Sequence, residues 1–486
     1  MNKTMHLAII LLVVTLVWSD SLYAANDKTS DNPNVVIILV DDMGYSDSGS
    51  YNPNSQIPTP NIDSLAQKGM RFTDAHAPGA LCHPSRYGLM TGQYPFRIDY
   101  TVWPTQPLIK KDQTTLASLL KSAGYRTNMV GKWHLGFKES SYDKTLPGGP
   151  VDRGFDTFYG MRASTDIPPY FYIRGEQAVF PPTGEIAGNA SEGWSNIQGA
   201  FWRAGGIAPD LKLPDVLPRF TNEAVSIIEK HAASKTEDPM MLYLAYPAPH
   251  TPWLPDAEFI GKSNAGMYGD FVVMVDAMIG RVLTALDDAN MSDNTLVIFA
   301  SDNGPIWYDV DALRFGHDPR AGLRGMKGDA WEGGHRMPFI VRWPDQVKAH
   351  STTDQTISFT DVMATLAAIT DTSLAKGAGP DSFNFLPVLI GQQPVNKPIR
   401  GPVVIPAGNN VMSIRSGPWK LITTLGSGGF SKPRVVKPVA GGPTAQLYNM
   451  ATDKAETSNV FLKHPDIVKR LQAELAHIKS VKQTRP

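Results

Sequence analysis

The run Asn34-Val-Val-Ile-Ile-Leu-Val40, which stands between Pro33 and Asp41, decides the fold of this chain. It is continuously apolar and rich in β-branched residues, which is typical of a strand buried on both faces of a parallel sheet. Similar runs occupy residues 240–246 and 295–300, with a weaker one at 338–343. Helical patterns lie between them at residues 61–68, 114–123 and 268–289. Strands that alternate with helices predict an α/β sheet covered on both faces.

In the C-terminal part, short strand-like pieces replace the long buried runs. They are separated by Gly and Pro turns and lie at residues 402–405, 411–415, 419–424 and 446–448. A last helix follows Pro465. We therefore predict a main domain over residues 25–380 and a C-terminal subdomain over residues 381–486, made of a small antiparallel sheet and one packed helix. The glycine-rich stretch 426–443 is predicted to be a loop and receives no role.

The composition excludes two broad classes of protein. Because 42% of the 486 residues are hydrophobic, the chain is not globally disordered. Because 45 Lys+Arg stand against 46 Asp+Glu, the chain does not bind nucleic acid by bulk neutralisation of phosphates. Any site for an anion must therefore be built from a few placed cations.

The N-terminal segment has the pattern of a targeting signal. Lys3 precedes an apolar run from Leu7 to Trp18, and small residues follow at Ala24 and Ala25. This predicts a secretory signal peptide over residues 1–24, hence an exported protein, periplasmic or secreted, with no membrane attachment after cleavage. The alternative is an N-terminal membrane anchor, although the apolar run is too short to span a bilayer comfortably.

Polar side chains follow two of the predicted strands. Asp41-Asp42 ends the first strand, and Ser301-Asp302-Asn303-Gly304 follows the strand at 295–300. In open α/β sheets, ligands bind beyond the carboxyl ends of the strands. Carboxylates and an amide oxygen suit Ca²⁺ or Mg²⁺. For either piece alone, helix capping and turn formation are the plainer interpretation; two pieces at equivalent strand ends favour a metal site.

The single cysteine lies in a distinctive motif. Cys82-His-Pro-Ser-Arg86 is followed by Thr91-Gly92. A lone cysteine is ordinarily a buried, inert thiol. This motif, however, resembles that of the type I sulfatases of the alkaline phosphatase superfamily, in which the cysteine is oxidised to formylglycine. The other motifs of that family follow in the same order, at residues 40–44, 131–136, 248–252, 301–304 and 327–334.

The resemblance implies a fold, a cofactor and a set of roles. It implies a large mixed, mostly parallel sheet sandwiched by helices, as in alkaline phosphatase, within a catalytic domain over residues 25–380. It implies Ca²⁺ (Mg²⁺ as the alternative) bound by Asp41, Asp42, Asp302, Asn303 and the modified Cys82. It also implies that Arg86 holds the modified residue, Lys132 and Lys327 bind sulfate, His134 contacts the formylglycine hydroxyl and His250 protonates the leaving oxygen. A formylglycine-generating enzyme would be a partner during maturation. One departure is Pro247-Ala248-Pro249-His250, where the family often has His-x-Pro-His.

The substrate is predicted from two loops that contain aromatic and charged residues, 150–172 and 307–320. Aromatic faces with a few charged groups suit a sugar; loop packing is the alternative interpretation. Within these loops we expect Asp166 to accept sugar hydroxyls, Tyr170 to stack on the ring, and His317 and Arg320 to reach the same pocket. The expected reaction is exo-removal of sulfate from a galactose- or N-acetylgalactosamine-type sugar of a sulfated glycan.

Two other functions compete with a sulfatase. One is a phosphodiester or phosphonate monoester hydrolase of the same superfamily, and the other is a non-catalytic binder of sulfated glycans. Relatives of the first kind commonly have Asp-His where this chain has Asp302-Asn303, so the asparagine favours a sulfatase. The second is disfavoured because this chain has a suitable residue at every position to which the resemblance assigns a catalytic or metal-binding role.

Overall fold

The central sheet is built around the apolar run near the N-terminus. In the computed structural model, which describes residues 32–100 and 106–485, this run forms β1 (Asn34–Asp41), buried from Val35 onward. It pairs in parallel with β10 (Met240–Pro249) on one side and β11 (Thr295–Ser301) on the other. Both neighbours are buried along their whole length, as expected in the middle of a sheet covered on both faces. The signal peptide predicted over residues 1–24 lies outside the described residues.

The large sheet has ten strands in the described part of the chain, in the order β13-β2-β12-β11-β1-β10-β4-β5-β6-β7. The further strands are β2 (Met70–Phe72), β4 (Arg126–Lys132), β5 (Thr157–Met161), β6 (Ile173–Arg174), β7 (Gln177–Ala178), β12 (Phe339–Arg342) and β13 (Ser351–Thr353). The strands from β11 to β5 are parallel, whereas β12 runs antiparallel to both β11 and β2. The sheet is therefore mixed and mostly parallel, as predicted.

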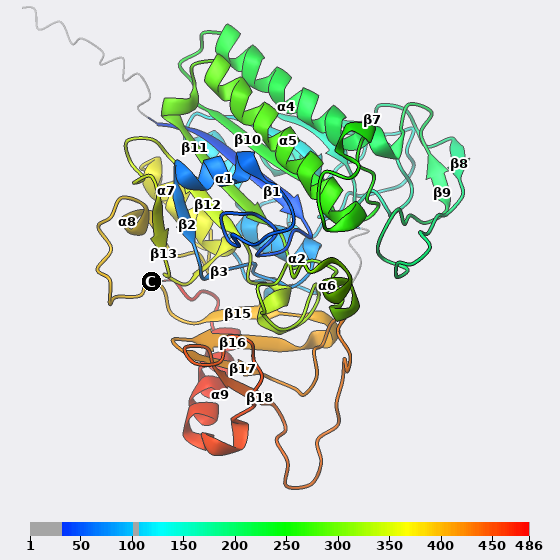
Figure 1. Ribbon diagram of the computed structural model, residues 1–486. Helices are drawn as coiled ribbons and strands as arrows, with labels where there is room; N and C mark the ends of the chain where they lie inside the picture. The colour runs from blue at the N-terminus through cyan, green and yellow to red at the C-terminus, as the bar shows by residue number, and fades with distance from the viewer. Residues whose placement is uncertain (1–31, 101–105, 486) are drawn as a thin grey trace, which may run out of the picture. The chain divides into compact units, whose positions relative to one another are not determined.

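Two groups of helices cover the sheet. On one face, α1 (Pro60–Gln67) and α4 (Val216–Ala233) each pack against α5 (Gly266–Asp288), and α4 and α5 lie side by side over β10 (Figure 1). On the other face, α2 (Cys82–Thr91), α3 (Leu116–Ser122) and α7 (Val362–Ile369) pack together. The helices predicted at 61–68, 114–123 and 268–289 are present with small differences at their ends. Five short elements lie in the connections: β3 (Ala75–His76) pairs with β14 (Ile357–Ser358), β8 (Gly184–Ile186) pairs with β9 (Gly205–Ile207), and α6 (Asp309–Phe315) follows β11.

The C-terminal part forms a four-stranded antiparallel sheet with one helix, as predicted. Its strands are β15 (Val403–Pro406), β16 (Met412–Ser416), β17 (Trp419–Ile422) and β18 (Gln446–Asn449), in that order. The helix α9 (Pro465–Ser480) lies on this sheet and buries Leu471 and Leu475 against Leu421 and Leu447 (Figure 1). The predicted boundary at 380/381 falls before α8 (Leu386–Leu389).

A buried cluster of charges joins the small sheet to the segment between β11 and β12. The Nζ atom of Lys420, on β17, lies 2.9 Å from Oε1 of Glu332 and 2.8 Å from Oε1 of Glu456. All three side chains are completely buried. Burial raises the pKa of Glu456 to about 7, whereas Glu332 keeps a pKa well below its usual value because Lys420 and other cations outweigh its burial. Loss of one partner would leave an uncompensated buried charge.

Among the described residues, no helix combines the length and apolarity that crossing a membrane requires.

The packing of α9 predicts the effect of a core truncation. Leu471 is completely buried, so Leu471→Ala should lower the free energy of unfolding by about 2–5 kcal/mol, because the lost side chain leaves a cavity. Leu462, which is 60% exposed, provides the control, and Leu462→Ala should change stability by less than about 0.5 kcal/mol. Urea denaturation of both variants measures the difference. Equal stability of the two variants would contradict this packing.

Candidate active site

Four neighbouring parallel strands place polar side chains at one edge of the sheet. In the order β11, β1, β10 and β4, their carboxyl ends lie side by side. The side chains at or just beyond these ends are Asp302 and Asn303 (β11), Asp41 and Asp42 (β1), His250 (β10), and Lys132 and His134 (β4). Residues far apart in the sequence thus meet where ligands of α/β sheets bind.

The centre of this edge is a cluster of buried carboxylates. One oxygen each of Asp41, Asp42 and Asp302 and the sulfur of Cys82 all lie within 4.8 Å of one another. Burial and the charge of Asp41 raise the pKa of Asp302 to about 7, so this arrangement favours an added positive charge. The side-chain oxygen of Asn303 is also buried here and forms no hydrogen bond, while its amide donates to Asp42 at 2.6 Å. Oxygen donors of this kind fit a hard divalent cation.

Each carboxylate also has its own cationic side chain. Nζ of Lys132 lies 2.5 Å from Oδ2 of Asp41, and Nζ of Lys327 lies 2.6 and 2.8 Å from the two oxygens of Asp42. Nε of Arg86 donates to Oδ2 of Asp302 at 2.8 Å. Burial by itself would raise the pKa of Asp41, but Lys132 and the other nearby cations hold it well below its usual value. Similarly, Asp42 raises the pKa of Lys327 despite burial, so this lysine is charged at neutral pH.

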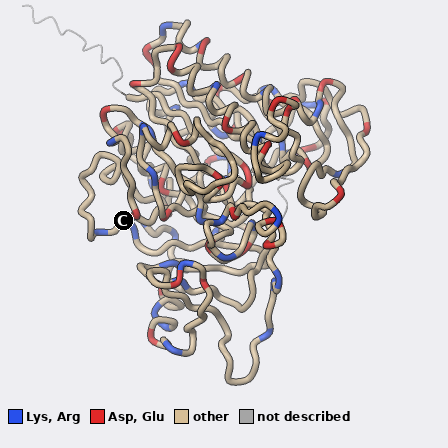
Figure 2. The backbone as a smooth tube through the Cα atoms, viewed as in Figure 1, with Lys and Arg blue, Asp and Glu red and all other residues tan. Residues whose placement is uncertain are grey.

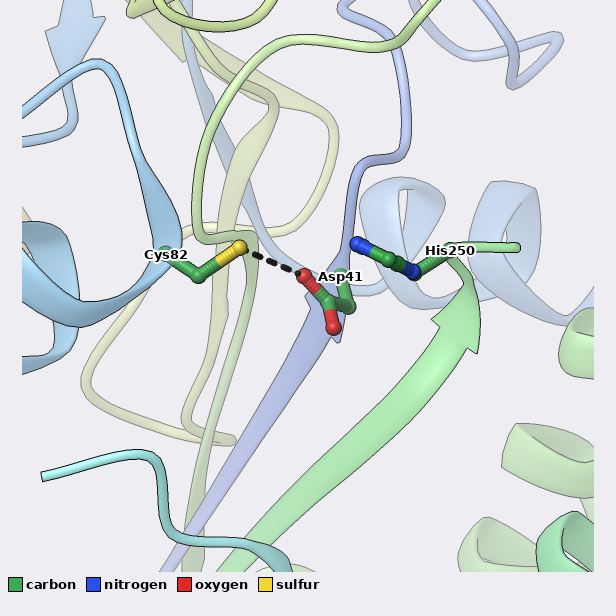
Figure 3. A group of neighbouring side chains, drawn as sticks. All are labelled: Asp41, Cys82 and His250. Carbon is green, nitrogen blue, oxygen red and sulfur yellow. Dashed lines mark hydrogen bonds between the residues drawn. The ribbon is translucent and has the colours of Figure 1, made fainter. Parts of the chain in front are cut away.

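Cys82 lies at the first turn of α2, directly beside the cluster. Its Sγ atom is 3.3 Å from Oδ1 of Asp41 (Figure 3). Burial and the negative charge of Asp41 raise the pKa of this thiol, so it stays protonated at neutral pH. A protonated thiol is a poor nucleophile. The unmodified cysteine is therefore in the right place for catalysis but in the wrong chemical form.

Two histidines flank the cluster. His250 lies on the other side of Asp41 from Cys82 (Figure 3), with Nδ1 2.7 Å from the carbonyl of Thr251 and Nε2 3.6 Å from Oδ2 of Asp42. Since the carbonyl only accepts, Nδ1 carries a proton and Nε2 faces the cluster. Burial and Lys132 hold the pKa of His134 well below its usual value, so its imidazole is neutral at neutral pH. His134 and Asp42 both have a left-handed backbone, with φ of 58° and 65°, and such conformations in non-glycine residues concentrate at functional sites.

These groups open into a pocket of about 500 Å³. Asp42, Cys82, His134, His250 and Lys327 line it, whereas Lys132 and Arg86 are buried behind its wall. Asp166 also lines the pocket, as expected. One of its carboxylate oxygens accepts a hydrogen bond from Arg203 at 2.5 Å, and the other is buried without a hydrogen bond, 3.8 Å from Nδ1 of His250.

Three residues expected at the substrate end do not line the pocket. Tyr170 is completely buried and its hydroxyl donates to the carbonyl of Arg203, so it offers no stacking face. His317 is buried against Trp307, with Nε2 2.8 Å from Asp47. Arg320 lies in a neighbouring groove and pairs with Asp318 and Asp309. The expectation that His317 and Arg320 reach the same pocket was therefore wrong, because their local acidic partners hold them elsewhere.

Sequence reasoning also missed part of the pocket wall. Arg203, Ile167, Ile197, Ile306 and Phe430 line the pocket but belong to no recognised motif. Ile167 lies within the predicted substrate loop 150–172 and Ile306 directly precedes the loop 307–320, so proximity was a usable signal for both. Arg203 and Phe430 come from distant loops without periodicity, and no local pattern indicates them.

Comparison with known proteins agrees with this geometry. The sequence model of the family described as Sulfatase matches residues 33–372. An N-acetylgalactosamine-6-O-sulfatase of Bacteroides thetaiotaomicron is 33% identical to this chain, and the alignment covers 94% of each protein. Human arylsulfatase A is 32% identical over 82% of this chain and 76% of its own length.

A solved structure gives the same result. A protein from a study of the metabolism of multiple glycosaminoglycans by Bacteroides thetaiotaomicron superimposes with a TM-score of 0.80 at 32% identity. The match covers 93% of this chain and 100% of the other. This chain therefore belongs to the sulfatase family, and it is a sulfuric ester hydrolase.

Proposed function

We propose that this sulfatase removes a 6-O-sulfate, in exo fashion, from a galactose- or N-acetylgalactosamine-type sugar of a sulfated glycan. The observation that carries the proposal is the relationship to an N-acetylgalactosamine-6-O-sulfatase over nearly the whole of both chains. The pocket supports it, because about 500 Å³ accommodates a small ligand and its wall adds Asp166 and Arg203 as polar partners for hydroxyls. A sulfatase that acts on simple aryl esters would not need such partners.

The proposed nucleophile is formylglycine, formed from Cys82 by a formylglycine-generating enzyme of the host. The hydrated aldehyde would supply an oxygen nucleophile that the buried, protonated thiol cannot provide. The position beside Asp41 keeps the thiol of Cys82 protonated. The same position would place the modified residue 82 next to the carboxylate cluster.

The proposed metal is one Ca²⁺, with Mg²⁺ as the alternative. Asp41, Asp42, Asp302 and Asn303 would hold it, together with the modified residue 82. Its chemistry would be to neutralise the oxygens of a bound sulfate ester. A second group of potential ligands, His76, Glu332 and His335, suits a cation poorly because Nζ of Lys420 lies 3.1 Å from Nε2 of His335.

The remaining roles belong to side chains of this protein. Lys327 lines the pocket and binds sulfate oxygens, and Lys132 adds positive charge from behind Asp41. Arg86 holds the helix that carries residue 82 by its bonds to Asp302 and to the carbonyl of Lys132. The Nε2 atom of His250 protonates the leaving sugar oxygen. The neutral imidazole of His134 would accept the proton of the second hydroxyl of the hydrated residue 82, so that the carbon–oxygen bond to sulfate can break and the aldehyde is restored.

The protein is proposed to act outside the cytoplasm. The basis is the targeting pattern of residues 1–24, which would be removed on export to the periplasm or the medium. Sulfated glycans are large and highly charged, so an enzyme that degrades them is expected where they are encountered.

The nucleophile can be tested on the purified protein. Trypsin should release Phe72–Arg86, which contains Cys82, and mass spectrometry should show the sulfur replaced by a carbonyl oxygen. Cys82→Ala should abolish turnover while the unfolding transition is retained, because the role of the residue is chemical. An active preparation in which this peptide is entirely unmodified thiol would contradict the mechanism.

The metal can be tested by chelation. Treatment with a chelator should inactivate the enzyme, and Ca²⁺ should restore activity better than Mg²⁺. Asp302→Ala should lose both bound metal and activity, because it removes a carboxylate of the cluster. Elemental analysis should find one ion per chain. Two ions, or full activity without any, would refute the assignment.

Asp166 can be tested by comparing two substrates. Asp166→Ala should lower kcat/KM about tenfold to a hundredfold on N-acetylgalactosamine 6-sulfate, which corresponds to roughly 1.5–3 kcal/mol for a charge-assisted hydrogen bond. The loss on a small aryl sulfate should be under about threefold, because that substrate has no sugar hydroxyls. The carbonyl of Thr251 continues to hold the ring of His250 in this variant.

The matched control for this test is Asp210→Ala. It breaks a similar aspartate–arginine pair, with Arg219, outside the pocket. It should affect neither substrate. If Asp166→Ala reduces activity equally on both substrates, Asp166 does not recognise the sugar.

A further inference from the structure

A second, larger groove adjoins the active-site pocket. It has a volume of about 920 Å³, and its walls include the turn Arg320–Met326, the loop segment Phe430–Arg434 and Thr457. Phe430 lines both this groove and the active-site pocket. The two cavities are therefore neighbours that share the side chain of Phe430.

The loop that carries Phe430 is built onto the active site. Gly429 packs directly on Gly328, the residue after Lys327, and a Cβ atom at Gly429 would lie 2.1 Å from the carbonyl carbon of Gly328. On either side, the amide of Ala330 donates to the carbonyl of Ser427 at 2.8 Å, and the amide of Ser431 donates to Asp329 at 3.1 Å. The groove and the pocket are thus fixed relative to each other by short backbone contacts.

The groove carries positive charge that is not neutralised within the protein. Among its cations, Arg320 pairs with Asp309 and Asp318, and Arg324 stacks on Trp331 with its guanidinium 3.7 Å from the ring centroid. Lys432 and Arg434 are exposed and take part in none of the ion pairs found among residues 32–100 and 106–485; the guanidinium of Arg434 lies 5.8 Å from the ring centroid of Phe430. Their loop, residues 426–443, contains three basic residues and no acidic one (Figure 2). Since the whole chain has a net charge of −1, this is a local feature.

We propose that the groove binds the sugar unit next to the one that carries the cleaved sulfate, and that Lys432 and Arg434 pair with an anionic group on that unit. The group is a carboxylate or a second sulfate, both of which arginine can bind bidentately. Phe430 offers an apolar face to the linkage between the two units. This inference rests on the proposed function and extends it, because it makes the natural substrate an oligosaccharide with at least two anionic units.

The test compares four substrates with wild-type enzyme, of which the first three probe the carboxylate. They are N-acetylgalactosamine 6-sulfate, the same sugar linked to a uronic acid, and that disaccharide with its carboxylate converted to a methyl ester. A further disaccharide with a second sulfate in place of the carboxylate distinguishes the two anionic groups. Wild-type kcat/KM should be higher for the anionic disaccharides than for the ester, and this advantage should shrink as salt is raised, because the site is exposed.

The variant Lys432→Ala/Arg434→Ala should remove this preference. Exposed ion pairs are individually weak, so we expect a loss of about threefold to tenfold in kcat/KM on the anionic disaccharides. The loss on the methyl ester and on the monosaccharide should be under about twofold. Lys437→Ala is the matched control, because Lys437 is an exposed cation of the same loop that does not line the groove.

The outcomes separate this inference from the proposed function. If wild-type enzyme desulfates the sugars but the double variant loses nothing, or loses equally on charged and neutral disaccharides, the anionic subsite is refuted while the proposed function stands. The same holds if Lys437→Ala has as large an effect, since this would indicate general attraction by the loop. If wild-type enzyme acts on aryl sulfates but on none of these sugars, the proposed function fails and the subsite fails with it.

Discussion

The active site depends on the enforced proximity of three buried carboxylates. Asp41, Asp42 and Asp302 meet because β1 and β11 are adjacent parallel strands that end at the same level. In a medium of low dielectric, their mutual repulsion must be balanced by cations. The protein supplies one cation to each carboxylate, and the donor set still has an unbonded oxygen on Asn303. Two of these cations, Lys132 and Lys327, are also the ones that we propose act on the sulfate of the substrate.

The C-terminal sheet has a structural part in this arrangement. Lys327 belongs to the segment between β11 and β12, and it lies outside the helical turns of this segment, α6 and the short 3-10 helix Glu332–Gly334. Its backbone is held by Ala80, next to the start of α2, which accepts from Gly328 at 2.7 Å. Further along the same segment, Glu332 is anchored to β17 through Lys420. The small sheet therefore stabilises the segment that carries a pocket lysine, in addition to shielding its own apolar core.

Sequence patterns predicted the parts of the protein whose burial follows from their own residues, such as a continuous apolar run that forms a buried strand. The buried runs at 34–40, 240–246 and 295–300 became central strands, and the polar residues that follow them came together because parallel strands share one edge.

The substrate end was predicted less well. Arg320 was expected in the pocket because it follows the strand that ends at Asp302 and Asn303, yet Asp318, only two residues away, binds it in the groove. Tyr170 was expected to stack on a sugar, yet it is buried with its hydroxyl on the carbonyl of Arg203. Which way a loop side chain faces depends on partners that periodicity does not indicate.

The groups that we propose carry out the reaction lie at or near strand ends, whereas the groups that we propose recognise the sugar lie in loops. The carboxylate cluster, Cys82, His250 and Lys327 all lie within residues 33–372, the part that matches the family as a whole. Phe430, which lines both the pocket and the groove, lies beyond that region. Loops tolerate changes that a close-packed sheet does not, because few core contacts depend on them. A change of substrate can therefore arise in the loop that carries Phe430 while the geometry of the reacting groups stays fixed, provided that Gly429 keeps its contact with Gly328.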